Sequence, residues 1–137
     1  MSDEKLVKNF ISYEDIMDQM KTQRYSSLLL KFGGERCPPC RALDRGPLEE
    51  LNVYINKELL KKGTQTLLVV NCDVNHPQIT PLLAEMTLPS FNSIPAFFLF
   101  KYINNKLVLR NESRGYDMAQ PKVWFENFAK LILSSLN

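Results

Sequence analysis

Short runs of hydrophobic residues alternate along the chain with longer stretches in which hydrophobic residues recur at helical spacing. Residues 27–32 and 66–72 are almost continuously apolar, and their lengths fit strands buried on both faces of a sheet. Residues 9–11 predict a shorter strand. Ser12 and Asp15 then form a start like a capping box, so we expect a helix to follow that strand.

Three further stretches have helical spacing. Residues 38–62 present a broad apolar face, although Gly46–Pro47 should kink or interrupt this helix. Thr80 can cap a short third helix and Pro81 can open it. A last helix is expected at 121–136, where aromatic and aliphatic residues share one face.

Two more strands, 96–102 and 106–111, lie before the last helix and are separated by only three residues. Such a short connection fits a hairpin, so we expect this pair to be antiparallel. The complete pattern predicts the α/β class, with a central mixed sheet of about five strands flanked by four helices. The 137 residues suit a single domain spanning 1–137.

Composition and charge exclude several classes of function. The net charge of +2 is spread along the chain without a dense basic stripe, so we expect no nucleic-acid partner. There is no run of about 20 apolar residues and no signal-peptide pattern, so we expect no membrane association and a cytoplasmic location. The three cysteines are an odd, low number, unlike the disulfide framework of a small secreted domain.

The candidate chemistry lies in the segment "GGERCPPCRAL", residues 33–43. A thiol at the start of a helix lies near backbone N–H groups that have no helical partner, and the helix dipole there favours a thiolate. Cys37 occupies such a position, where thiol pKa values are roughly 3.5 to 7.5 rather than about 8.5. We assign Cys37 as the nucleophile and Cys40, one turn later, as the resolving cysteine. Pro38 and Pro39 stiffen the loop between the two cysteines and help to set the redox potential of the pair.

Three motifs resemble thioredoxin in their order and spacing: "CPPCR", then "VVNCDVN" on the next strand, then "SIPAFFLF" at the start of the hairpin. The resemblance covers nearly the whole chain. It implies a thioredoxin-like fold, protein disulfide oxidoreductase activity, and a redox-active Cys37–Cys40 disulfide without a bound cofactor. It also implies that Pro95 is cis and faces the cysteines, and that the backbone of Ile94 pairs with an extended substrate segment. We expect Gly115–Tyr116 to complete the substrate groove.

Four residues depart from the thioredoxin pattern. Arg36 replaces an aromatic residue before the first cysteine, Gly33 replaces a tryptophan, and the helix-kinking proline is displaced to Pro47. Lys31 occupies the position of a buried acid that moves protons to and from the second cysteine. If Lys31 points toward the pair, its cation stabilises the Cys37 thiolate, so the couple becomes more oxidising than that of a typical thioredoxin. Alternatively, the Lys31 stem follows an edge and its amine reaches solvent.

The main alternative to a redox site is a zinc site. Cys72 and His76 have a C-x₃-H spacing, and with Cys37 and Cys40 they make four possible ligands. The prolines within the first pair restrict the backbone that usually wraps a metal, which argues against zinc. Cys72 alone is typical of a small buried side chain at a strand end, and a third redox thiol is a second interpretation of it.

Two further alternatives concern activity rather than metal binding. One is a binding module that keeps the fold and uses the cysteine face only to hold a partner. The other is a glutathione-linked activity, with which the proline after Cys37 is compatible. The intact Cys37, Cys40 and Pro95 favour an enzyme. Its expected partners are disulfide-containing proteins and a reductant that is either thioredoxin-reductase-like or another dithiol.

Overall fold

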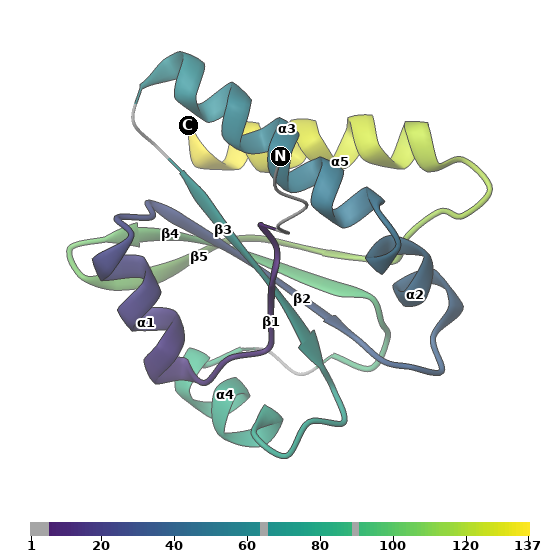
Figure 1. Cartoon of the computed structure of the whole chain (residues 1–137), viewed down its shortest axis with the longest axis horizontal. Coiled ribbons are helices and arrows are strands. Elements are labelled where there is room, and N and C mark those ends of the chain that lie inside the picture. The colour runs from purple at the N-terminus through teal and green to yellow at the C-terminus, as the bar shows by residue number, and fades with distance from the viewer. Residues whose placement is uncertain (1–5, 64–65, 89–90) are drawn as a thin grey trace, which may run out of the picture.

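The computed structural model describes residues 6–63, 66–88 and 91–137 (Figure 1). Its elements follow the predicted order of strands and helices. They are β1 (Lys8–Asn9), α1 (Tyr13–Thr22), β2 (Ser27–Gly33), α2 (Pro38–Asp44), α3 (Pro47–Lys62), β3 (Leu67–Asp73), α4 (Ile79–Met86), β4 (Ala96–Ile103), β5 (Lys106–Arg114) and α5 (Pro121–Leu136). The α/β class with a five-stranded mixed sheet is confirmed.

The sheet has the strand order β1-β3-β2-β4-β5. β1, β3 and β2 are parallel, whereas β4 runs antiparallel to β2 and forms the predicted antiparallel hairpin with β5. The central strands are almost entirely buried, as their continuous apolar sequences require. Because β2 and β3 are parallel, their carboxyl ends lie side by side. The segment with the two cysteines leaves the sheet at this edge.

Helices cover both faces of the sheet. In Figure 1, α3 and α5 lie on one side of the strands, and α1 and α4 lie on the other. Successive side chains of a strand point to opposite faces, so Leu28, Leu30 and Phe32 of β2 pack in the core beneath α1 and α4. Leu29 packs in the opposite core with residues of α2, α3 and α5. Lys31 shares the face of Leu29 and is thereby directed beneath α2.

The stretch at 38–62 forms two helices, so the structure has five helices in its described residues where four were predicted. α2 ends at Asp44, and α3 begins with Pro47 directly after Gly46. Proline has no N–H to continue the hydrogen bonds of a preceding helix, and it is well suited to the first position of a new one. The predicted interruption at Gly46–Pro47 is therefore complete rather than a bend.

Several predicted boundaries are displaced, most of them by one or two residues, and β5 extends to Arg114 rather than ending at 111. Thr80 lies inside α4 rather than at its cap, because the helix already begins at Ile79 after a turn in which His76 accepts the Ile79 N–H at 3.0 Å. The first strand pairs with β3 only through Lys8 and Asn9, instead of 9–11. The predicted cap of α1 is confirmed, since the Ser12 hydroxyl accepts the Asp15 N–H at 3.2 Å.

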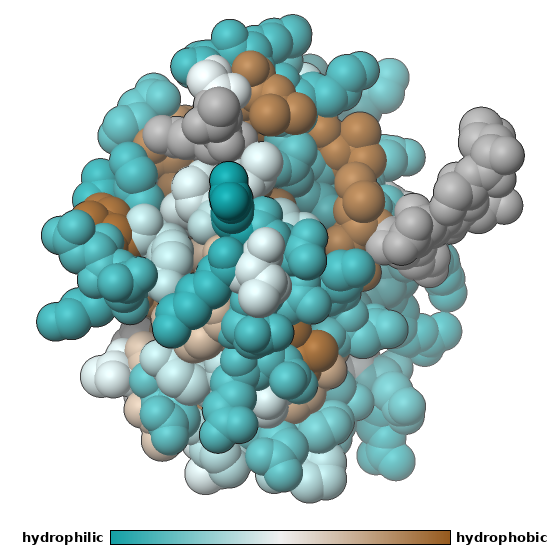
Figure 2. Space-filling view, turned by 60° about the vertical axis from the view of Figure 1, so that its left-hand side comes forward, coloured by the Kyte–Doolittle hydropathy of each residue, from teal (hydrophilic) through white to brown (hydrophobic). Residues whose placement is uncertain are grey.

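The face shown in Figure 2 is mainly hydrophilic and carries one short hydrophobic band in its upper part. Within the described residues, no helix has both the length and the apolar character that a bilayer crossing needs.

Candidate functional site

A disulfide joins Cys37 and Cys40 at the start of α2, with their Cα atoms 5.2 Å apart. Cys37 is the N-cap of the helix, and its Sγ accepts the N–H of Cys40 at 3.3 Å. The exposed fraction is 8% for Cys37 and 1% for Cys40. The first sulfur is thus the more accessible of the two and already receives a backbone N–H, as a thiolate would require.

The local sequence explains why the chain turns into a helix here. The Cys37 N–H donates to the Gly34 carbonyl at 3.2 Å, which closes a turn after β2. Pro38 and Pro39 occupy the first helical positions, where a missing N–H leaves no hydrogen bond unmade. The first intrahelical bond runs from the Arg41 N–H to the Cys37 carbonyl at 3.0 Å. Rigid prolines and this bond fix the position of the disulfide.

The segment before β4 lies directly against the disulfide. The Ile94–Pro95 peptide bond is cis, and the Ile94 carbonyl oxygen lies 3.7 Å from Cys37 Sγ. The Gly115 N–H donates to the Pro95 carbonyl at 2.8 Å, and Gly115 has a φ of 85°, which favours glycine. The structure therefore brings Cys37, Ile94, Pro95 and Gly115 to one end of the sheet.

Tyr116 continues this end of the sheet. Its ring packs edge-to-face on Trp124 with the centroids 4.7 Å apart. Burial raises the pKa of Tyr116, and the nearby carboxylates of Glu50 and Asp117 raise it further, so the phenol stays protonated. Arg36 is exposed beside Cys37. Together with Cys37 and Ile94, it lines a cavity of about 560 Å³ that opens next to the more accessible sulfur.

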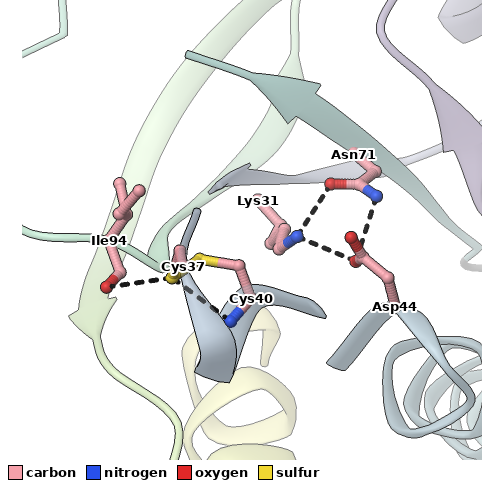
Figure 3. Close-up of a disulfide and its surroundings, with 6 residues drawn as sticks. All are labelled: Lys31, Cys37, Cys40, Asp44, Asn71 and Ile94. Atoms are coloured by element: carbon pink, nitrogen blue, oxygen red, sulfur yellow. Dashed lines mark hydrogen bonds and ion pairs between the residues drawn. A yellow bond between two sulfur atoms is a disulfide. The ribbon is translucent and has the colours of Figure 1, made fainter. Parts of the chain in front are cut away.

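Lys31 is buried, with an exposed fraction of 1%, so the alternative of an amine in solvent is wrong. Its Nζ donates to Asp44 Oδ1 at 2.8 Å and to Asn71 Oδ1 at 3.0 Å, and Asn71 Nδ2 donates to the same Asp44 oxygen at 3.1 Å. Figure 3 shows these three residues on one side of the disulfide and Ile94 on the other. A buried ammonium needs such a partner, because an isolated charge in the interior is very costly.

Sequence reasoning missed Asp44 and Asn71. Two signals pointed to them once the helix and strands were placed. Asp44 lies one turn after Cys40 on α2, and therefore on the same side of that helix. Asn71 is the direct neighbour of Lys31 across the parallel pair of β2 and β3. A lysine inside an apolar strand was itself a signal that an acid would be found close by.

Cys72 and His76 do not gather with the disulfide. His76 stacks on Phe10 with the ring centroids 4.3 Å apart, and its Nδ1 accepts the Gln78 N–H at 3.0 Å. Cys72 is buried, which raises the pKa of its thiol to about 12 despite an opposing effect of Lys31. Across residues 6–63, 66–88 and 91–137, no three His, Cys, Asp or Glu side chains are placed to hold one metal ion. The zinc alternative and the reactive role for Cys72 therefore lack a geometric basis.

Solved structures of similar fold include several of low sequence identity. A thioredoxin of Trichomonas vaginalis is 21% identical, with a TM-score of 0.59 over 91% of this chain and 99% of the other. Chloroplastic thioredoxin z is 18% identical, with a TM-score of 0.58 over 98% of this chain and 99% of its own. The crystal structure of a complex of ferredoxin:thioredoxin reductase with thioredoxin f2 gives 21% identity and a TM-score of 0.56, over 95% of this chain and 94% of the matched chain. No family model and no curated protein matches the sequence.

These similarities establish that the chain has the thioredoxin fold. They extend over nearly the whole chain, as the sequence resemblance did.

Proposed function

We propose that this protein is a thiol–disulfide oxidoreductase that exchanges its Cys37–Cys40 pair with disulfides of other proteins. One observation carries the proposal: the pair forms a disulfide at the start of α2, and Cys37 is the N-cap whose sulfur accepts a helix N–H. A sulfur in that position is stabilised as an anion. The thioredoxin fold supports the proposal, because it surrounds the pair with a matching scaffold.

The exchange proceeds in two balanced steps. In the reduced protein, the Cys37 thiolate attacks one sulfur of a substrate disulfide, and the other substrate sulfur leaves as a thiolate with the electron pair. Cys40, as a thiolate, then attacks Cys37 in the mixed disulfide and releases the second substrate sulfur. The protein disulfide is formed and the substrate is reduced by two electrons. The same steps run backwards when a substrate dithiol is oxidised.

The substrate side is formed by the main chain around Ile94 and Pro95, with Gly115 and Tyr116 next to it. An extended peptide can pair with the Ile94 backbone in the manner of an added strand. Arg36 at the rim favours acidic residues in the substrate, although an exposed charge contributes little. We assign Pro38 and Pro39, together with Lys31 and Arg36, to tuning the redox potential of the couple.

The partners follow from the same chemistry. The substrates are proteins with accessible disulfides, and the electrons come from a thioredoxin-reductase-like protein or another dithiol. A structure of similar fold describes the thiol-resolving mechanism of a yeast mitochondrial 1-Cys peroxiredoxin via glutathione and thioredoxin systems. We place the protein in the cytoplasm, since a reducing compartment suits a reversible dithiol.

Reduction of insulin by dithiothreitol tests the proposal. The protein at catalytic concentration should accelerate precipitation of the insulin chains over dithiothreitol alone. No acceleration would favour the binding module instead. Supplying electrons from glutathione in one reaction and from a flavoprotein reductase in another distinguishes a glutathione-linked enzyme from a thioredoxin-like one.

A further inference from the structure

A cation lies beneath the second cysteine rather than beneath the first. A Cβ atom added to Gly33 would be 2.8 Å from Lys31 Nζ and 3.0 Å from Cys40 Cβ. The lysine amine and the Cys40 side chain therefore flank the same point. Gly33 leaves this space free, and any larger residue there would separate the amine from the cysteine or displace one of them. In Figure 3, Lys31 lies beside the disulfide, on the side of Cys40.

The cluster holds the Lys31 side chain in place. Asp44 supplies the counter-charge at 2.8 Å, and Asn71 holds both partners through its amide. The Lys31 side chain is 1% exposed and that of Asp44 is 40% exposed, so the carboxylate reaches water while the ammonium does not. Water screens the charge of Asp44 more than that of Lys31. At Cys40 the positive charge is therefore the stronger of the two.

A cavity of about 390 Å³ adjoins the cluster and is lined by Lys31, Gly33, Asp44 and Asn71. Its other charged or titratable lining residues are Arg41, Glu35, Asp73, His76 and Cys72. Arg41 is exposed, and burial raises the pKa of the Cys72 thiol to about 12. Lys31 is thus a buried basic side chain among the residues that line this cavity. The cavity is large enough for water, which can accept a proton from the site.

We propose that the Lys31–Asp44–Asn71 cluster makes Cys40 a resolving cysteine that ionises without a carboxylate base. This inference rests on the proposed function. Asp44 and Asn71 are positioning residues: they hold the ammonium beside Cys40, and the ammonium favours the thiolate of Cys40 in the mixed disulfide. Cys40 does not itself line the cavity, so its proton reaches water there past Gly33, which lines the cavity and lies against the Cys40 side chain. The Cys40 thiolate then forms a bond to Cys37 sulfur, the bond from Cys37 to the substrate breaks, and the substrate thiolate leaves with the electron pair.

The test is a titration of Cys40 in the Cys37→Ser protein, followed by the ultraviolet absorbance of the thiolate. The protein with both cysteines replaced by serine supplies the background from tyrosines. Cys72 does not interfere, because its pKa of about 12 lies above the range of the titration. Replacing Lys31 with Met in this protein should raise the midpoint by about one pH unit or more, which is a tenfold loss of thiolate. Arg41→Met is the matched control, since it removes an exposed positive charge from the same cavity.

A charge exchange separates an electrostatic role from a structural one. The double variant Lys31→Asp with Asp44→Lys keeps one acid and one base in the cluster but places the acid beside Cys40. The midpoint of the Cys40 titration should be higher in this double variant than in the Cys37→Ser protein. A purely structural ion pair would leave that midpoint unchanged. A Lys31→Met midpoint no higher than that of Arg41→Met would overturn the inference. Because the titration needs no substrate, failure of insulin reduction would count against the proposed function alone.

Discussion

The two sides of the disulfide are built from different parts of the chain. On the substrate side, the contacts are main-chain atoms: the Ile94 carbonyl beside Cys37 and the bond from the Gly115 N–H to the Pro95 carbonyl. On the interior side, the contacts are the side chains of Lys31 and its two partners. The overall fold is shared with a thioredoxin that is 21% identical in sequence. The interior contacts depend on the identity of three side chains, so we expect substitutions there to change the proposed redox chemistry most specifically.

The largest effect is expected on the substrate side, at the accessible sulfur. The Cys37→Ser protein should lose at least about a hundredfold in the rate of insulin reduction, because the nucleophile is absent. Cys72→Ser is the matched control and should keep nearly the full rate, since that thiol is buried and protonated. If both variants lost the same fraction of the insulin-reduction rate, the assignment of Cys37 as the reactive thiol and Cys72 as an unreactive one would be contradicted.

The next effect concerns the stability of the interior side. Asp44→Asn should lower the free energy of unfolding by about 2 kcal/mol, because it leaves the buried Lys31 ammonium without its counter-charge. Lys31→Met should cost less, since the remaining Asp44 carboxylate is 40% exposed and is solvated. Urea unfolding of the oxidised proteins compares the two. The opposite order of stabilities would mean that Lys31 is not held as a buried cation.

The same cation should influence the redox potential of the couple. In Lys31→Met the potential is expected to fall by about 30 mV or more, which corresponds to a tenfold change in the equilibrium with glutathione. The redox potential falls because reduction of the disulfide creates a thiolate, and the variant lacks the Lys31 cation that stabilises this thiolate. Mass spectrometry of acid-quenched glutathione buffers measures the oxidised fraction. A potential that stays constant or rises would show that the interior side does not tune the exchange.

A further change in stability, confined to alkaline pH, is expected from Cys72. Its pKa is raised from 9.0 to about 12 in the folded protein, so the unfolded chain loses the thiol proton first as pH rises. The free energy of unfolding should therefore fall between about pH 9 and pH 12, by at most about 1.4 kcal/mol per pH unit from this group. Cys72→Val removes that contribution. Urea unfolding of both oxidised proteins across this range should give a shallower decline for the variant.

Much of the fold was predictable from hydrophobic pattern alone. The apolar runs at 27–32 and 66–72 are too short for buried helices and fit strands that are buried on both faces of a sheet. The three residues between the last two predicted strands are enough only for a hairpin connection. The boundary at Thr80 was not predictable, because it depends on a turn closed by His76. Element boundaries respond to such local hydrogen bonds, whereas element identity responds to burial over many residues.

The candidate site was only partly predictable. Spacing and the two prolines indicated a redox pair at Cys37 and Cys40, since those features act locally. The partners of Lys31 were not predictable, because Asp44 and Asn71 are separated from it by 13 and 40 residues. Only the packing of α2 over the face of β2 and β3 brings the three together. A buried lysine thus shows that an acid must be near, but the fold decides which acid it is.

Trapping of a mixed disulfide tests the central claim most directly. The Cys40→Ser protein, mixed with a peptide that contains a disulfide, lacks the residue that would release the bound substrate sulfur. Peptide mapping by mass spectrometry should find the substrate peptide attached to Cys37. Attachment at Cys72, or no attachment under conditions where insulin is reduced by the unmodified protein, would contradict the assignment of Cys37 as the nucleophile.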